Sequence, residues 1–220
     1  TGILWDNQGS LSVKTSSIEI IAGGVECAVC QLQYSPAGRL FFALDGRDDE
    51  RGLQADCWDL YAWDGQSVVR ITNDVSEYGE AHWIFGQQRY AVLDEERIIA
   101  ARILSGSDQL VEIDLLHSTV SVFDAECATG LSHLSPVGRE AVVYAAASFS
   151  RATAAHVCSI ENREISEWFS SEPLLDDVDI SVPEHLSYST SDGERSYAWY
   201  YRPKNHLFQA PPGDKPPLLV

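Results

Sequence analysis

Short runs of apolar residues separated by polar turns recur along the chain and set its predicted architecture. Residues 40–44 read LFFAL and residues 141–146 read AVVYAA, which is the length and composition of strands rather than of helices. The sequence has no long stretch of apolar residues at the 3.6-residue spacing of an amphipathic helix. The pattern therefore predicts an all-β chain whose strands are joined by tight turns.

A repeated motif divides these strands into units. The letters LQYSPAGR at residues 32–39 return as SHLSPVGR at residues 132–139, and a degenerate copy, HWIFGQQRY, lies midway at residues 82–90. We interpret each copy as a strand, a turn and a second strand. The expected second strands are residues 40–44, 90–93 and 141–146. Two more strands follow in each unit: residues 58–63 and 67–72, 109–115 and 119–123, and 155–160 and 164–169.

A period of about fifty residues with four strands per unit is typical of a β-propeller. A four-stranded blade cannot bury both of its faces alone, so blades stack around a common axis. Residues 3–5 and 11–13 have the pattern of two outer strands of an earlier blade. We therefore expect residues 1–172 to form a partial β-propeller of about three and a half blades.

The sequence changes character after residue 172. Residues 173–183 are polar, acidic and rich in turn formers, and we interpret them as a linker. Within residues 184–220, two alternating apolar runs flank Asp192-Gly193, which predicts a β-hairpin. A proline-rich loop then leads to residues 218–220, which we expect to begin a buried third strand of a second, truncated domain.

Both ends of the chain indicate an internal piece of a longer protein. The chain begins with Thr1, contains no methionine, and stops on the first residues of the expected third strand. Any targeting segment would then lie before Thr1.

The charge of the chain limits its partners. The formal net charge is -18, and such an acidic surface repels phosphate backbones, so we expect no nucleic-acid partner. The sequence has no apolar run near the roughly 20 residues needed to span a bilayer, and we expect no membrane partner. An acidic cavity could attract the amino terminus of a peptide. The alternative is that the charge only keeps the surface soluble.

The five cysteines are read as apolar fillers. Cys27 and Cys30 form a C-x-x-C pair, but the sequence has no second pair at zinc-ribbon spacing and no predicted helix after them. The acidic loop at residues 45–50 lacks the spacing of a calcium loop. We expect no metal and no cofactor. An odd number of irregularly spaced cysteines favours a reducing, cytoplasmic compartment.

Several segments resemble one enzyme family. YSPAGRL at residues 34–40, CWDLY at residues 57–61 and EYGEAHWIFG at residues 77–86 resemble blade segments of the prolyl oligopeptidase family of serine peptidases. YYRPKN at residues 200–205 and KPPLLV at residues 215–220 resemble the segments that open its α/β-hydrolase domain. The resemblance is nearest to the branch of acylaminoacyl-peptidases and dipeptidyl-aminopeptidase-like enzymes. It implies that residues 184–220 are the first strands of an α/β-hydrolase domain.

The resemblance also implies a function. Such enzymes cleave short peptides through an acyl-enzyme formed on a serine in a G-x-S-x-G turn, with an acid and a histidine. The sequence contains no G-x-S-x-G. The nearest match, at residues 130–133, lacks the second glycine and falls on a predicted strand. The catalytic groups are therefore expected beyond Val220, and this piece alone is expected to be inactive.

In that family the propeller caps the active site and restricts its substrates. Glu26 and Glu80 lie on loops that lead into predicted innermost strands, where a carboxylate could pair with the α-amino group of a peptide. The alternative is that both are solvated turn residues. Trp58, Trp63 and Trp83 are interpreted as packing between blades.

A second class of function remains open. The chain could belong to a non-catalytic propeller that binds protein partners as a scaffold. The C-terminal segment distinguishes the two, because a scaffold propeller has no need of a hairpin, a proline-rich loop and a further strand. The peptidase hypothesis implies short peptides and the chain's own hydrolase domain as partners.

Overall fold

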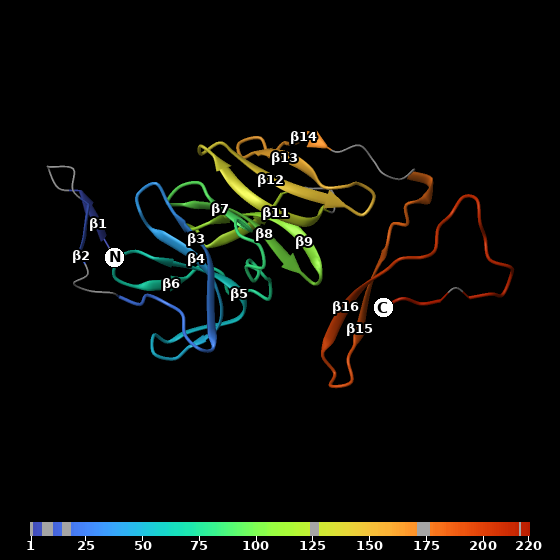
Figure 1. The fold of residues 1–220 in the computed structure, drawn as a ribbon, viewed down its shortest axis with the longest axis horizontal. Coiled ribbons are helices and arrows are strands. Elements are labelled where there is room, and N and C mark those ends of the chain that lie inside the picture. The colour runs from blue at the N-terminus through green and yellow to red at the C-terminus, as the bar shows by residue number, and fades with distance from the viewer. Residues whose placement is uncertain (1, 6–10, 15–18, 124–127, 171–176, 216) are drawn as a thin grey trace.

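The computed structural model of the protein describes residues 2–5, 11–14, 19–123, 128–170, 177–215 and 217–220. These residues form antiparallel strands and one short 3-10 helix, with no α-helix among them (Figure 1). The prediction of an all-β chain is confirmed. Cys127 and Pro216 lie outside the described residues.

Three four-stranded antiparallel sheets form the centre of the molecule, and we call them blades 1, 2 and 3. Blade 1 contains β3 (Cys27–Tyr34), β4 (Leu40–Asp48), β5 (Leu53–Trp63) and β6 (Val68–Arg70). Blade 2 contains β7 (Tyr90–Val92), β8 (Arg97–Leu104), β9 (Ser107–Asp114) and β10 (Thr119–Val122). Blade 3 contains β11 (Ala128–Val137), β12 (Ala141–Ser148), β13 (Ala154–Ser159) and β14 (Ile165–Ser170). Strands that follow one another in the sequence are neighbours in each sheet, as in a propeller blade.

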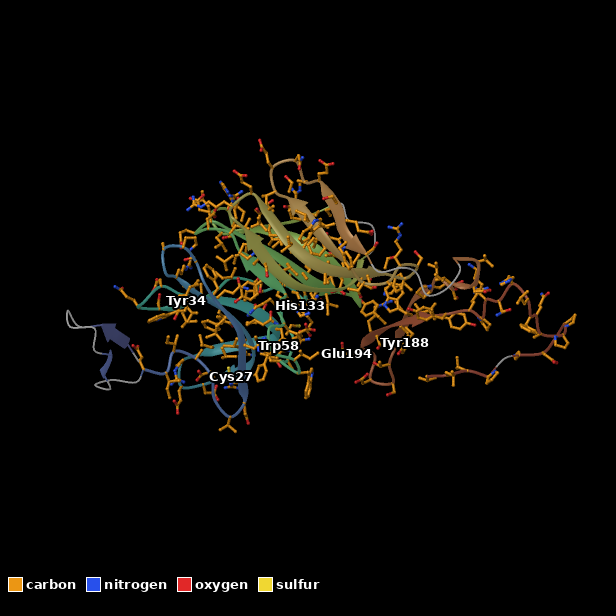
Figure 2. The ribbon with its side chains drawn as sticks, turned by 45° about the horizontal axis from the view of Figure 1, so that its top comes forward. Cys27, Tyr34, Trp58, His133, Tyr188 and Glu194 are labelled. Atoms are coloured by element: carbon orange, nitrogen blue, oxygen red, sulfur yellow. The ribbon has the colours of Figure 1, made fainter. Side chains whose placement is uncertain are left out.

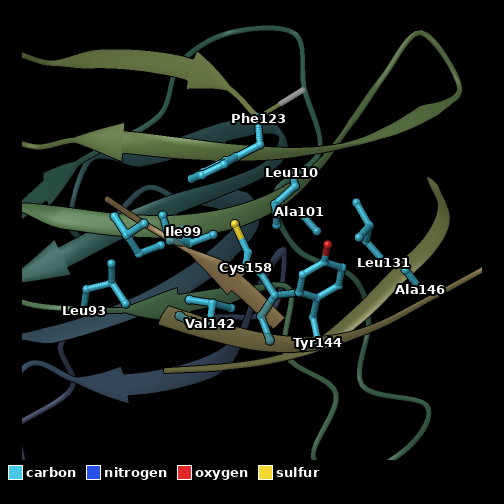
Figure 3. Packing of buried hydrophobic residues seen from close by; sticks show 13 residues of the cluster. Leu93, Ile99, Ala101, Leu110, Phe123, Leu131, Val142, Tyr144, Ala146 and Cys158 are labelled. Atoms are coloured by element: carbon cyan, nitrogen blue, oxygen red, sulfur yellow. The ribbon is translucent and has the colours of Figure 1, made fainter. Parts of the chain in front are cut away.

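Strand β8, the second strand of blade 2, is apolar on both faces because blade 1 covers one face and blade 3 covers the other. Alternate side chains of a strand point to opposite faces of its sheet. Ile98 and Ala100 pack in the cluster shared with blade 1, whereas Ile99 and Ala101 pack in the cluster shared with blade 3. Figure 3 shows the second cluster, in which Tyr144 and Cys158 of blade 3 meet Ile99 and Leu110 of blade 2. Uninterrupted apolar runs in this chain thus mark strands between two layers.

The first strands of the blades lie at the common edge. Strand β7 is beside both β3 and β11. The side chain of Gln33 joins blades 1 and 2, because its Nε2 donates to the backbone O of Tyr90 (2.6 Å) and its Oε1 accepts from the backbone N of Val92 (3.2 Å). This arrangement places β3, β7 and β11 on the inner side of an arc of blades.

Arg89 joins all three blades at this edge. Its backbone N donates to Oε1 of Gln31 in β3 (2.8 Å), and its Nη1 donates to the backbone O of Leu131 in β11 (2.9 Å). Its guanidinium also forms an ion pair with Asp108 of β9, while only 3% of the side chain is exposed. Arg89 could not be recognised from the sequence, because the pattern of apolar residues carries no information about a buried polar link.

One assignment within the repeat is wrong. Residues 90–93 are predicted to be the second strand of their unit, yet β7 is the first strand and β8 is the second. The supposed strand before them, at residues 82–89, is an irregular loop. The turn between β7 and β8 has neither proline nor glycine. Instead, Oδ1 of Asp94 accepts hydrogen bonds from the backbone N of Glu96 (3.0 Å) and Arg97 (2.9 Å), which closes the turn without the motif.

Two hairpins flank the blades (Figure 1). The first pairs β1 (Gly2–Trp5) with β2 (Leu11–Lys14), and the second pairs β15 (Glu184–Ser189) with β16 (Arg195–Tyr200). The C-terminal hairpin is therefore formed where the sequence predicts it, and the two strands expected near the N-terminus pair with each other in a two-stranded sheet. Of the predicted linker, residues 173–176 lie outside the described part of the chain, and Asp177–Asp179 is a 3-10 helix.

The predicted buried strand at residues 218–220 is not formed. Leu218, Leu219 and Val220 are exposed and belong to no strand. A strand needs a neighbour for its backbone hydrogen bonds and a layer to cover its side chains. Within the described part of the chain, no segment provides either to these residues.

Candidate functional site

One end of the blades gathers the loops that lead into their first strands. Because neighbouring strands are antiparallel, the turns between second and third strands lie at this same end. We call it the entry end. Its described residues are 19–26, 49–52, 71–89, 105–106 and 149–153.

Glu26 lies at the entry end, directly before β3. Its backbone O accepts a hydrogen bond from the backbone N of Arg47 (2.8 Å). Gly46 permits this contact, because a Cβ at that position would lie 2.2 Å from the same oxygen, and its φ of +88° favours glycine. The side chain of Glu26 is exposed, and its carboxylate forms no ion pair within the described part of the chain.

Glu80 lies at the same end but closer to the blades, and its side chain is half-buried. Its backbone O accepts from Sγ of Cys30 (3.4 Å) and from Nε2 of Gln31 (3.3 Å), which fixes it beside strand β3. Burial, and after it the nearby charge of Glu80, raises the pKa of the Cys30 thiol to about 12. Among the described residues, no cationic side chain forms an ion pair with the Glu80 carboxylate.

The structure therefore brings both predicted glutamates to one end of the molecule but does not join them. The backbone of each glutamate is fixed by its own hydrogen bonds, on loops that precede different blades. They are two separate positions at which a positive charge could bind, rather than one carboxylate pair.

The loop after Glu80 corrects another prediction. Trp83 is 88% exposed, so its assignment to packing between blades is wrong. Ile84 and Phe85 beside it are 65% and 98% exposed. Trp58 does pack against the cluster between blades 1 and 2, and Figure 2 shows it within the blades. Trp83 lies in the repeat unit whose strands are predicted at the wrong positions, and this is why its predicted environment is wrong.

Trp63 packs against a third apolar cluster, formed by Phe42, Leu44 and Tyr61 among others. This cluster lies on the face of blade 1 opposite to blade 2, because Phe42 and Leu44 alternate along β4 with Phe41 and Ala43 of the cluster shared with blade 2.

The two cysteines of the C-x-x-C pair are separated by the sheet itself. Cys27 packs in the cluster on the outer face of blade 1, and Cys30 packs in the cluster between blades 1 and 2. Both are buried free thiols. Within the described residues, no group of three histidine, cysteine, aspartate or glutamate side chains is arranged to hold a metal ion.

The C-terminal hairpin contacts the entry end. His185 Nε2 donates to the backbone O of Ser105 (2.9 Å), and Trp199 Nε1 donates to the backbone O of Gly106 (3.2 Å). The ring of Trp199 also packs against Phe149, with 4.5 Å between ring centroids. Ser105 and Gly106 form the β8–β9 turn, and Phe149 follows β12. The hairpin and the two glutamates therefore belong to the same end of the arc.

Two histidines form pairs with aspartates at the surface, but neither pair has the form of a catalytic triad. His117 pairs with Asp114, and His206 pairs with Asp179, each over 2.8–2.9 Å. Hydrogen bonds from His206 lower the pKa of Asp179. No serine hydroxyl bonds to either histidine among the described residues, and Ser132 of the nearest nucleophile-like motif lies within β11.

The described residues contain no helix that is long and apolar enough to cross a membrane.

Comparison with solved structures relates this arrangement to known peptidases. The sequence matches no family model and no curated protein. A puromycin hydrolase structure aligns with a TM-score of 0.77 at 20% identity, over 98% of this chain and 31% of its own. A puromycin-hydrolyzing peptidase from Mycobacterium tuberculosis aligns with a TM-score of 0.73 at 16% identity, over 94% of this chain and 31% of its own. A prolyl endopeptidase structure aligns with a TM-score of 0.56 at 12% identity, over 80% of this chain and 24% of its own.

At these identities the likeness shows the fold. This chain has the partial propeller fold seen in the matching part of those peptidase structures, and it spans 31% of the length of the puromycin hydrolase. Coverage of 98% means that the likeness extends past the three blades into the C-terminal segment.

Proposed function

We propose that this chain is the propeller part of a longer serine peptidase that hydrolyses short peptides through an acyl-enzyme. The observation that carries the proposal is the likeness to puromycin hydrolase over 98% of this chain, including the segment after the blades. The serine, acid and histidine of the reaction are assigned to the protein beyond Val220, and this chain alone is inactive. Residues 184–220 are assigned to the opening strands of an α/β-hydrolase domain, after a linker at residues 173–183.

In this proposal the propeller controls access to the active site. The C-terminal hairpin leads into the hydrolase domain and contacts the entry end, so that end faces the catalytic groups. A cap of this kind restricts the site to short or unfolded peptides, and it excludes water from the bound substrate. The dipeptidyl-aminopeptidase-like branch, and action on the free amino end, belong to the same proposal.

Glu26 and Glu80 are proposed to bind the α-amino group of the peptide. Their carboxylates form no ion pair with another described residue, so a positive charge from the substrate would meet them without displacing a partner. Glu80 is half-buried, and the interaction of two opposite charges strengthens as water is removed. Glu26 is exposed and is expected to contribute less.

The Glu80→Gln variant of the full-length protein tests this role. It keeps the side-chain volume and removes the charge, so KM for peptides with a free amino end should rise about tenfold, as expected for a lost hydrogen bond to a charged group. Glu26→Gln should raise KM by about threefold or less, because an exposed pair contributes little.

N-acetylated peptides are the matched control, since they carry no α-amino charge. Their KM should not change in either variant. Unchanged KM values for free-amino peptides in both variants would show that the two carboxylates are solvated turn residues.

The chain's charge bears on its proposed partners, and its free thiols bear on its proposed compartment. Short peptides and the hydrolase domain are its proposed partners, and the net charge of -18 disfavours nucleic acid. Free thiols at Cys27, Cys30, Cys57 and Cys158 support a reducing, cytoplasmic compartment.

A further inference from the structure

Three consecutive apolar side chains are exposed on a loop at the entry end. Trp83 and Phe85 are among the most exposed apolar residues of the blades, at 88% and 98%, and Ile84 lies between them. Exposed apolar residues that occur singly need no explanation, whereas three in succession on one loop indicate a contact surface.

The loop is fixed by its own polar groups rather than by its apolar side chains. The backbone N of Trp83 donates to the backbone O of Ala81 (2.9 Å), and the backbone N of Ile84 donates to Oε1 of Gln87 (3.3 Å). His82 Nε2 donates to the backbone O of Gln87 (3.1 Å). The turn is therefore closed without burial of Trp83 or Ile84, which leaves these side chains free to bind something else.

A contact to blade 3 places the loop at the inner edge of the arc. His133 of β11 donates from Nδ1 to the backbone O of Gly86 (3.3 Å). Glu80, three residues before Trp83, is fixed beside β3 of blade 1. The loop thus lies between the first strands of two blades, with a half-buried carboxylate at its beginning and apolar side chains at its tip.

We propose that Trp83 and Phe85 bind the apolar side chain of the amino-terminal residue of a peptide whose α-amino group pairs with Glu80. This inference rests on the proposed function and names its substrate class: peptides that begin with a large apolar residue. Such an amino terminus is complementary to the loop in both respects, because it carries a positive charge next to an apolar group.

The Glu80 carboxylate favours a peptide amino terminus, rather than the surface of another protein domain, as the partner of this loop. The core of a protein–protein interface is depleted of charged groups, since a carboxylate buried there without a partner is costly. Glu80 has no cationic partner among the described residues, so a purely apolar surface would leave its charge uncompensated. A peptide amino terminus supplies the missing charge.

The test measures binding to the full-length protein without requiring hydrolysis. Two tripeptide probes begin with Phe or Gly, and both of their peptide bonds are replaced by hydroxyethylene groups that cannot be cleaved. Calorimetric titration gives Kd for each probe. Trp83→Ala and Phe85→Ala should each weaken binding of the Phe probe by about tenfold or more, as for an aromatic side chain at the centre of a contact. Binding of the Gly probe should change by less than about twofold.

The matched controls are Trp168→Ala and Phe169→Ala. These residues are 77% and 70% exposed on the outer strand β14, so they test the same substitutions away from the loop, and Kd should not change. Equal weakening of both probes by Trp83→Ala would show that the loop packs against another domain, and would overturn the proposal. Unchanged binding of the Phe probe in both loop variants, or no binding of either probe by the unmodified protein, would also overturn it.

Hydrolysis is measured separately, so the two proposals can fail independently. If the protein binds the Phe probe as expected but hydrolyses no peptide, the side-chain site is correct and the peptidase assignment is wrong. If it hydrolyses peptides but the loop variants bind the Phe probe normally, the peptidase assignment is correct and the site is wrong.

Discussion

At the scale of single residues, Arg89 is the polar group that most constrains the blades. Its side chain is 3% exposed and bonds to groups on β9 and β11, while its backbone N bonds to β3. A buried charge is tolerated only when partners compensate for its loss of hydration. Asp108 provides that compensation, and it also accepts a hydrogen bond from the backbone N of Gly130 (2.6 Å).

Replacement of Arg89 by methionine tests this link. The substitution keeps much of the apolar stem but leaves Asp108 without its ion-pair partner, and loss of one member of a buried pair costs about 3–5 kcal/mol. Urea unfolding followed by circular dichroism should show this loss. The control is Arg47→Met, because the Arg47–Asp49 pair is 62% and 68% exposed and such pairs contribute about 0–1 kcal/mol. Equal losses in the two variants would contradict the role of Arg89.

At the scale of elements, the sequence predicts strands well where the apolar pattern is strong. The run at residues 40–44 lies in β4 and the run at residues 141–146 lies in β12, because both strands are covered by neighbouring layers. The strands of blade 2 are assigned to the wrong positions in the repeat. The turn between β7 and β8 is closed by the side chain of Asp94, and it lacks the Pro-Gly motif that marks the corresponding turns of the other blades. The exposure of Trp83 could not be predicted either, since aromatic residues in a strand-rich chain are usually buried.

The contact between the C-terminal hairpin and the β8–β9 turn also could not be predicted from the sequence. It joins residues far apart in the chain through backbone oxygens, such as the bond of Trp199 to Gly106, and any residue type supplies a backbone oxygen. Gly106 and Tyr197 approach each other closely in this contact, since a Cβ at position 106 would lie 3.3 Å from Cβ of Tyr197.

This close approach allows the contact to be trapped. Disulfides form between residues whose Cβ atoms are about 3.5–4.5 Å apart, and a shift of a few tenths of an ångström brings positions 106 and 197 into that range. The double variant Gly106→Cys and Tyr197→Cys should therefore cross-link on mild oxidation and separate on reduction. Mass spectrometry after alkylation measures the yield, with the Tyr197→Cys single variant as control. Trp199→Ala in the same background should slow the cross-linking, because it removes the hydrogen bond and the ring contact with Phe149. If both introduced thiols remain free after oxidation, the hairpin does not dock on blade 2.

At the scale of the whole molecule, the chain is an arc of three blades with a hairpin at each side (Figure 1). Apolar clusters join the blades, and polar contacts at the first strands fix their order around the arc. The entry end carries the candidate binding groups and also receives the C-terminal hairpin. The blades have the fold of the matching part of the puromycin hydrolase structure.

We propose that the propeller belongs to a serine peptidase whose nucleophile lies outside these 220 residues. Labelling of the full-length protein with a fluorophosphonate, followed by mapping of the modified peptide, tests it most directly, because the reagent reacts with an activated serine. We expect one labelled serine, located after Val220, and no label on the 220-residue chain alone. A full-length protein that takes up no label, or a label on a serine within residues 1–220, would contradict it and favour a propeller that serves as a scaffold.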